Sequence, residues 1–364
     1  MSGVTWKERL RAVPVQTRLL AVLNAALVLI SAVCALSLFG LGNSFETITA
    51  AQRFRGGGET RFAQLACCLG VGQGKSEEDI QKLRSDLESK FVEQSLEAPE
   101  GGSLYMDAYS ARTQVTAVTE HATAQVSAIA VGGEFFYFHP LTLRSGAYIA
   151  ERDLMDDLVV LDEAMAWRLF GGVELAGMPL TINGKPFVVS GVVSLEDDFA
   201  SRQARGEDGI IFLSYSALAR IGDESTIDCY EIVMPDPISG YALGIMEEMM
   251  GGAEIVENSG RFTPRRLSEL LRSFGQRSMR TGAVIYPYWE NALRLAEDHG
   301  ALLLVLAVLT ALCPIITLAV LLIRAVRSLW RFLWREVPRR IGDAVERRRE
   351  KQYAKLAAKD REGE

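Results

Sequence analysis

The sequence predicts an α+β protein in which two transmembrane helices flank an extracytoplasmic domain with two lobes. Two long, nearly uncharged segments predict the membrane helices, and two strand–helix–strand patterns predict a ferredoxin-like lobe. A strand, helix and hairpin signal between those patterns predicts a second, β-rich lobe over about residues 125–215. The chain has 364 residues, 49% of them hydrophobic and 23% charged, which is enough for a membrane-attached protein with a sizeable soluble domain.

Two apolar stretches, residues 19–42 and 301–323, are each long enough for the roughly 20 residues that a bilayer core requires. Basic residues flank them: residues 1–18 hold four Lys and Arg against one Glu, and residues 324–364 hold thirteen against seven Asp and Glu. The rest of the chain holds 22 Lys and Arg against 38 Asp and Glu. The positive-inside rule therefore places both termini in the cytoplasm and residues 43–300 outside the plasma (inner) membrane.

A cleaved signal peptide is the alternative for the first apolar stretch. Its apolar run exceeds the ~7–15 residues of a typical signal sequence, and no small-x-small cleavage site follows it. A lipoprotein site at Cys34 is disfavoured because the preceding Val33 is bulky. We therefore interpret this stretch as a retained membrane anchor.

The clearest fold signal lies in the forty residues from Leu154 to Val193. Leu158–Leu161 is an apolar, β-branched run that is typical of a buried strand. Asp162 then occupies the N-cap position of a helix with one apolar face, and Gly171–Gly172 ends that helix. Asn183–Gly184, between two further apolar runs, is a strong two-residue hairpin signal.

Two strand–helix–strand units surround this segment. In the first, Phe62–Leu69 is a strand, Ser76 begins a helix with a capping-box pattern, and the next strand begins near Leu104. The same order of elements recurs over residues 227–257, without sequence identity between the two units. Two such units packed together would form the ferredoxin-like lobe.

Both apolar stretches are expected to continue into stalk helices, over residues 43–61 and 258–300. Helical spacing of apolar residues predicts that the first span continues as a helix from Asn43 to Phe54. In the second stalk, Pro264 suits the first turn of a helix. Trp289 lies about a dozen residues before the second span, which at ~1.5 Å per residue is too far out for an interfacial tryptophan, so we expect it to pack in the stalk or contact a protein.

The five cysteines divide between the membrane and the outer domain. Cys34 and Cys313 lie in the spans, and Cys67, Cys68 and Cys229 lie in expected outer strands, where buried thiols are favoured. A disulfide from Cys229 to Cys67 or Cys68 is the alternative. The spacing matches no disulfide framework and no zinc pattern.

The sequence predicts no catalytic residue, no cofactor site and no metal site. Gly70–Ser76 resembles a phosphate loop, but Leu69 occupies the position of the first required glycine. His121, His139 and His299 are scattered and have no ligand-like neighbours. The acidic outer domain also argues against nucleic acid as a partner. Because no catalytic motif is found, we expect a chain that is not an enzyme.

Three stretches carry a family resemblance: AIAVGGEFFYFHPLTLRSGAYI, then VVLDEAMAWRLFGG followed by GMPLTINGKPFVVSGVV, then GIIFLSYSALARIG. They are similar to the extracytoplasmic core domain of MacB-like ABC transporter permeases. The similarity covers the core domain expected over residues 62–257, and the motifs that carry it are packing signatures. The resemblance implies an outer domain of two lobes, one of them related to the porter domains of other exporters.

The resemblance also implies a mechanism, in which a separate cytoplasmic ABC ATPase moves the spans and the stalk passes that motion outward. Family permeases usually carry four spans, whereas this sequence shows two, so it resembles a shortened member that would serve as an auxiliary subunit beside a full-length permease, in a homodimer or heterodimer. The residues expected at the stalk are Phe45, Ile48, Trp289 and Arg294. The residues expected to dock at the inner surface are Arg327, Trp330, Arg331 and Trp334.

Three alternatives stay open at this stage. The basic tail is also typical of an ordinary stop-transfer flank with interfacial tryptophans. A sensor or scaffold that binds an envelope ligand or protein would need the same two spans and outer domain. A degenerate permease that has lost its function is the third.

Overall fold

The computed structural model describes residues 14–58, 60–96, 98, 102–153, 155–206, 209–274, 280–281, 284–336 and 341–351. The chain divides into two compact units. One unit is Ser37–Leu303, and the other combines the residues up to Leu36 with those from Leu304 onward. Most of the expected cytoplasmic N-terminus (1–18) and parts of the expected tail (324–364) lie outside the described residues.

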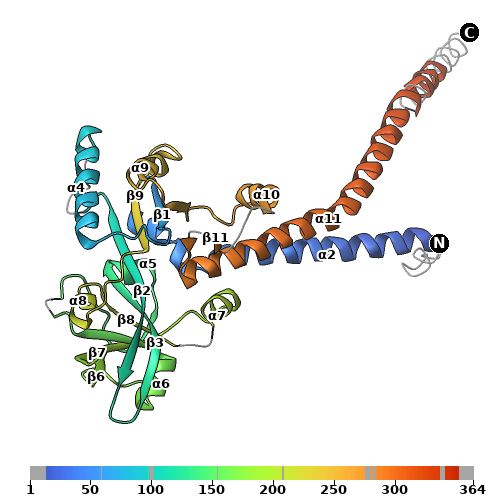
Figure 1. Cartoon of the computed structure of the whole chain (residues 1–364). Coiled ribbons are helices and arrows are strands. Elements are labelled where there is room, and N and C mark those ends of the chain that lie inside the picture. The colour runs from blue at the N-terminus through green and yellow to red at the C-terminus, as the bar shows by residue number, and fades with distance from the viewer. Residues whose placement is uncertain are drawn as a thin grey trace, which may run out of the picture. The chain divides into compact units, whose positions relative to one another are not determined.

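Ten of the described strands form one mixed sheet in the unit Ser37–Leu303 (Figure 1). Its main path has the order β10-β1-β9-β2-β3-β8-β5-β7-β4, and β6 pairs with both β2 and β7. The strands of this sheet are β1 (Phe62–Cys68), β2 (Met106–Val118), β3 (Thr123–Gly133), β4 (Thr142–Gly146), β5 (Leu158–Asp162), β6 (Pro179–Ile182), β7 (Lys185–Ser194), β8 (Ile210–Ser214), β9 (Cys229–Pro235) and β10 (Glu254–Glu257).

Short helices connect these strands, and a separate two-residue ladder pairs β11 (Arg280–Thr281) with β12 (Val284–Ile285). The helices within this unit are η1 (Glu46–Ile48), α3 (Ala50–Arg55), α4 (Glu77–Glu93), α5 (Phe135–Phe138), α6 (Glu163–Phe170), α7 (Phe199–Arg205), α8 (Ala217–Ile221), α9 (Tyr241–Met249) and α10 (Pro264–Ser273). Two longer helices, α2 (Val15–Asn43) and α11 (Tyr288–Arg331), each contribute residues to both units.

The predicted ferredoxin-like lobe is confirmed by the strand order β10-β1-β9-β2. β1 is antiparallel to both β9 and β10, and β2 is antiparallel to β9. Each βαβ unit therefore joins two parallel strands that have one strand of the other unit between them. α4 begins with the expected capping box, because Ser76 Oγ accepts the Asp79 N–H (3.2 Å) and Asp79 Oδ2 accepts the Ser76 N–H (2.9 Å). The predicted apolar stripe of α4 is buried: Ile80, Leu83, Leu87 and Phe91.

The β-rich lobe contains the predicted strand, helix and hairpin. β5 ends at Asp162, whose Oδ1 accepts the Met165 N–H (2.7 Å) and caps α6. Gly171 ends α6 in the left-handed conformation, with φ +77°. Asn183 (φ +46°) and Gly184 (φ +77°) form the tight turn between β6 and β7, so both central residues have the positive φ of a type I′ turn.

One long hairpin joins the two lobes. β2 and β3 pair over eleven residues, from Ala108 opposite Gly133 to Val118 opposite Thr123. β2 pairs with β9 near its start and with β6 near its end. The two lobes therefore share a continuous sheet instead of meeting at an interface between separate sheets.

The continuous helix expected beyond Asn43 is wrong. α2 ends there, Phe45 has extended backbone (φ −103°, ψ 102°), and η1 and α3 follow as separate short helices. The buried side chain of Gln64 on β1 stabilises this break, because its Oε1 accepts the Ala50 N–H (3.1 Å) and its Nε2 donates to Thr47 O (2.6 Å). A contact with a distant strand thus overrides the helical spacing of the sequence.

Two helices are long and apolar enough to cross a membrane. The spanning windows in Val15–Asn43 and Tyr288–Trp334 have mean hydropathy values of 2.6 and 2.8, and 6% and 0% of their residues are buried. An apolar surface that is not buried by protein suits contact with lipid. Ser31 Oγ donates to Ala307 O (3.1 Å), so the two helices are in direct contact within their unit, and Pro314 lies inside α11.

The three outer cysteines are expected to be unreactive thiols in the folded protein. Cys67, Cys68 and Cys229 are free and at most 1% exposed. Burial raises the pKa of Cys67, and the hydrogen bond with Cys68, followed by burial, raises the pKa of Cys229. N-ethylmaleimide at mildly alkaline pH should leave all three unmodified in the native protein and modify all three after denaturation, as mapped by peptide mass spectrometry.

Denaturation without reductant supplies the control for this measurement. If Cys68 and Cys229 stay unmodified in the denatured protein until a reductant is added, the free-thiol assignment is contradicted. These two residues are direct partners on neighbouring antiparallel strands.

Candidate functional site at the start of α11

The first turns of α11 lie in the unit Ser37–Leu303 and carry a buried group of ions. Arg261, in the segment before α10, donates through both terminal nitrogens to Glu290, with N–O distances of 2.7 Å. Its Nε donates to Glu297 Oε1 at 2.8 Å. Arg261 is 4% exposed and Glu290 is 1% exposed. One guanidinium therefore connects the segment before α10 to two residues of α11 that lie about two turns apart.

A second arginine completes the group. Arg294 Nε donates to Glu290 Oε1 (2.8 Å), and its Nη2 donates to Glu254 Oε1 on β10 (2.7 Å). The guanidinium also lies 3.8 Å from the ring centroid of Tyr286, a cation–π distance. We call Glu254, Arg261, Glu290, Arg294 and Glu297 the junction network.

Glu290 is the centre of the junction network. Burial alone would raise its pKa, but the charges and hydrogen bonds of Arg261 and then Arg294 outweigh burial and lower the pKa below its usual value. Burial opposes the charge on Arg261, yet Glu290 and Glu297 raise the pKa of this guanidinium. Glu290 and Arg261 thus keep each other ionised, an arrangement that suits mechanical attachment better than ligand binding.

Apolar side chains pack beside the junction network, among them two residues predicted from the sequence. Phe45 is 6% exposed and stacks on Phe262 with ring centroids 5.7 Å apart and an interplanar angle of 8°. Both rings pack with Ala292 and Leu293 of α11, and Ile48 packs against the same cluster. The break after α2 is therefore what brings Phe45 to the start of α11.

Trp289 lies in the first turn of α11 and is 4% exposed. Its ring centroid lies 5.6 Å from that of Phe135 and 4.6 Å from that of His139. His139, 1% exposed, contacts Glu231 of β9 through Nε2 at 2.5 Å. Trp289 is thus packed within the domain.

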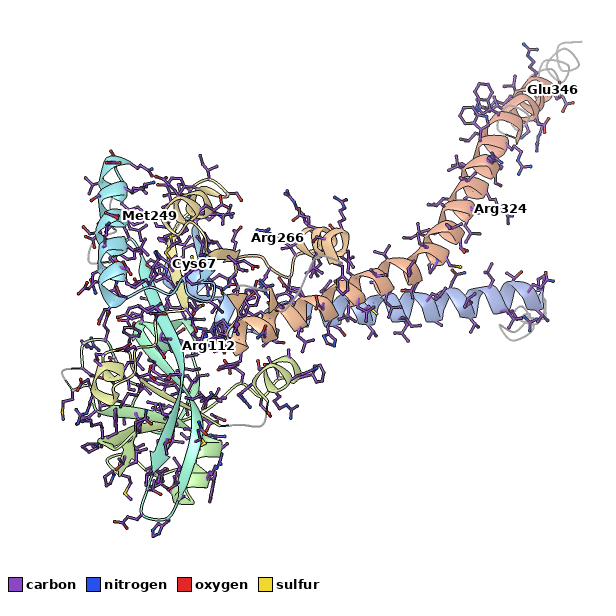
Figure 2. All side chains as sticks on the ribbon, viewed as in Figure 1. Cys67, Arg112, Met249, Arg266, Arg324 and Glu346 are labelled. Carbon is purple, nitrogen blue, oxygen red and sulfur yellow. The ribbon has the colours of Figure 1, made fainter. Side chains whose placement is uncertain are left out.

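A third arginine ties the central strand β2 to the chain just before α11. Arg112 Nη1 donates to Tyr286 O (3.1 Å), Nη2 donates to Ile285 O (2.5 Å), and Nε pairs with Asp228 (2.7 Å). Figure 2 shows Arg112 close to the start of α11. Burial raises the pKa of Asp228, although Arg112 opposes this shift. β2, β10 and the segment before α10 therefore all hold the same end of α11.

The structure brings the four predicted stalk residues Phe45, Ile48, Trp289 and Arg294 to this one site, and their role in coupling stays a prediction. The sequence analysis missed Arg261, Glu290 and Glu297. A signal was present, because Glu290, Arg294 and Glu297 follow the i, i+4, i+7 spacing of one helix face just before an apolar span. The partner Arg261 has no such local signal.

The predicted inner-surface residues lie in the other unit. Arg327, Trp330 and Arg331 belong to α11, and Trp334 belongs to the π-helical turn Phe332–Glu336. All four are exposed, and the rings of Trp330 and Trp334 lie 5.5 Å apart. Their exposure agrees with an interfacial or docking role without distinguishing the two.

Across the described residues, no group of three or more His, Cys, Asp or Glu is placed to hold a metal ion. The loop that resembles a phosphate loop is fixed both to β12 and to the segment before β9. Gly70 bridges Val284, Lys75 bridges Ile227, and a Cβ at Gly74 would lie 1.9 Å from Thr226 Oγ1. The glycine at this position is explained by close packing.

A family model, the MacB-like periplasmic core domain, matches residues 21–239. The match covers more than half of the chain. This chain belongs to the MacB-like family. The MacB-like chain is therefore an ABC-transporter permease-type subunit, a membrane protein with an extracytoplasmic segment. The match includes Phe45 and Ile48 and ends before Arg261 and α11.

Three solved structures are similar to the MacB-like chain. The periplasmic region of MacB from Actinobacillus actinomycetemcomitans is 17% identical, with 59% of this chain and 94% of that chain covered and a TM-score of 0.41. The extracellular domain of the noncanonic ABC-type transporter YknZ from Gram-positive bacteria is 13% identical, with 54% and 99% covered and a TM-score of 0.36. A domain of a putative permease protein from Porphyromonas gingivalis is 13% identical, with 54% and 86% covered and a TM-score of 0.29. The comparison with curated proteins finds no match.

Replacing Arg261 by methionine should destabilise the outer domain strongly. The substitution leaves Glu290 and Glu297 buried without their main counter-charge, which costs about 3–5 kcal/mol. Thermal or denaturant unfolding of the full chain in mild detergent would measure this loss. Arg265→Met is the matched control, since the Arg265 side chain is 88% exposed, and we expect it to change stability by less than about 0.5 kcal/mol. Equal stabilities of the two variants would contradict a structural role for the junction network.

Acidification should also weaken the junction network. The pKa of Glu290 is lowered on folding from a reference value of 4.5, so its contribution is complete above that value and is lost as the pH falls through the folded-state pKa. The unfolding temperature should therefore fall more steeply below pH 4.5 in the wild type than in Glu290→Gln. Glu269→Gln, at a half-exposed carboxylate on α10, should retain the wild-type slope. Identical slopes for wild type and Glu290→Gln would overturn this assignment.

Proposed function

We propose that this chain is an auxiliary, permease-type subunit of a MacB-like ABC transport system. In this proposal a separate cytoplasmic ATPase, alone or with a full-length permease, moves the membrane segments, and α11 transmits that motion to the outer domain. The chain itself carries no catalytic step, and ATP hydrolysis belongs to the partner.

One observation carries the proposal: the helix that contains the apolar span also contains three residues of the junction network. α11 runs without interruption from Tyr288 to Arg331, and its first turns hold Glu290, Arg294 and Glu297. The junction network and Arg112 attach this end to β10, to β2 and to the segment before α10. Displacement of α11 would therefore reach the shared sheet through charged contacts that are costly to break.

The charge distribution supports the proposed orientation, with both termini cytoplasmic and residues 43–300 outside. Basic residues are concentrated before the first span and after the second, whereas residues 19–323, which comprise the spans and the segment between them, are acidic overall. The inner docking surface in this proposal consists of Arg327, Trp330, Arg331 and Trp334. Their exposed guanidinium and indole groups suit a partner with acidic and apolar residues.

Co-purification from native membranes in mild detergent tests the proposal. The tagged chain should recover a protein with ABC ATPase motifs, identified by mass spectrometry. Arg327→Glu with Arg331→Glu should reduce that recovery severalfold, because the two reversals place acidic charge on the proposed docking surface. The amount of variant chain in the membrane fraction should remain unchanged.

Arg168→Glu with Arg202→Glu is the matched control, since both arginines are exposed in the outer domain. This double reversal should leave recovery of the ATPase intact. Recovery of a kinase or hydrolase in place of an ATPase would favour the sensor or scaffold and contradict the transport proposal. If the Arg327 and Arg331 reversals leave recovery of the ATPase unchanged, these residues do not form its docking surface.

A further inference from the structure

α10 is strongly amphipathic and lies outside the junction network. Its apolar side chains follow the i, i+3, i+4, i+7 spacing of one helix face: Leu267, Leu270, Leu271 and the C-cap residue Phe274. Its charged side chains, Arg265, Arg266, Glu269 and Arg272, lie away from that face. Three arginines against one glutamate make the helix basic, whereas the outer domain as a whole is acidic.

Packing within the chain explains only part of this apolar stripe. Leu267 is fully buried, but Leu271 is 37% exposed and Phe274 is 54% exposed. On this basic amphipathic helix, the two side chains leave an apolar area open to solvent on the same face as Leu267. Some apolar environment beyond the protein would therefore stabilise the second half of α10.

The position of Leu267 identifies that environment. A Cβ at Gly300 would lie 3.3 Å from Leu38 Cδ1, 3.4 Å from Leu267 Cδ1 and 3.5 Å from Leu41 Cδ2, so these three side chains converge on Gly300. Leu38 and Leu41 lie at the outer end of the first apolar stretch, and Gly300 directly precedes the second. α10 is therefore attached where both spans leave the hydrocarbon.

Exposed apolar side chains of both long helices lie close in sequence to this attachment. Phe39 is 73% exposed and Leu302 is 66% exposed, and both lie within two residues of the contacts that hold Leu267. Figure 2 shows Arg266 on α10 beside α11. Arg266 pairs with Glu257 (2.7 Å), and Arg265, which is exposed, pairs with Glu269 on the same helix (3.1 Å). Arg272 is also exposed.

We propose that α10 is an interfacial helix that lies on the outer lipid surface. Leu270, Leu271 and Phe274 enter the boundary between headgroups and acyl chains, and Arg265 and Arg272 contact headgroup phosphates. The proposal requires α2 and α11 to span the bilayer but is independent of any ATPase partner. It gives the outer domain a third attachment to the membrane, between the two spans in the chain.

Site-directed spin labelling of the full chain in phosphatidylethanolamine and phosphatidylglycerol vesicles tests the proposal. Labels at Phe274→Cys and Leu271→Cys report the apolar face, and a label at Arg265→Cys reports the polar face of the same helix. Four native cysteines are buried and Cys313 lies in a span, so the unsubstituted chain provides the background signal. Oxygen concentrates in lipid and a neutral nickel chelate in water, so collision rates with the two reagents locate each label.

The ratio of oxygen to nickel collision rates should be severalfold higher at positions 274 and 271 than at position 265. High nickel accessibility at all three positions would place α10 in water and overturn the proposal. Protection of positions 274 and 271 from both reagents would indicate cover by protein, such as a second copy of the chain, and would overturn it equally. A failed ATPase co-purification leaves these outcomes unaffected, so the two proposals can fail separately.

Discussion

The attachment of α11 depends on a carboxylate that stays ionised with 1% of its surface exposed. Glu290 tolerates this burial because Arg261 and Arg294 each donate to it at 2.7–2.8 Å. Both arginines have further acidic partners, so no single ion pair carries the contact. Such a group of charges contributes less to net stability than an apolar core of equal size, but it fixes which residues face one another. α11 is consequently held in one rotational position relative to β10.

Apolar packing and hydrogen bonds to the backbone complement these charges. Trp289 packs against Phe135 and His139. Phe45 and Phe262 stack on each other and pack against Ala292 and Leu293 of α11. Gln64 satisfies backbone groups where the chain leaves α2. The two chain segments that enter the outer domain are therefore both fixed by residues from the sheet, and the family assignment places this arrangement in a permease-type subunit.

Local sequence signals predicted most of the fold. The cap at Asp162, the Asn183–Gly184 turn and the apolar stripe of α4 each depend on residues within a few positions of one another, and each is confirmed. The order of elements was enough to predict the ferredoxin-like lobe. Helical spacing predicted a continuous helix through Phe45, which is wrong, and the stalk roles of Phe45 and Trp289 stay predictions.

Contacts between distant residues could not be predicted in this way. The helix break at Phe45 depends on Gln64 and on stacking with Phe262, and nothing near Phe45 in the sequence indicates either contact. Arg261, one of the two arginine partners of Glu290, likewise comes from a segment 29 positions away. Sheet continuity between the lobes depends on the β2–β3 register, which only the folded chain defines.

That continuity limits how the outer domain can respond to force. A relative rotation of the two lobes would shear the ladder between β2 and β3, and every backbone hydrogen bond along eleven residue pairs would have to yield together. Deformation is far easier at edge elements such as β4 and β10, each of which has a neighbouring strand on one side. The sheet is therefore stiffer between the two lobes than at its edge strands.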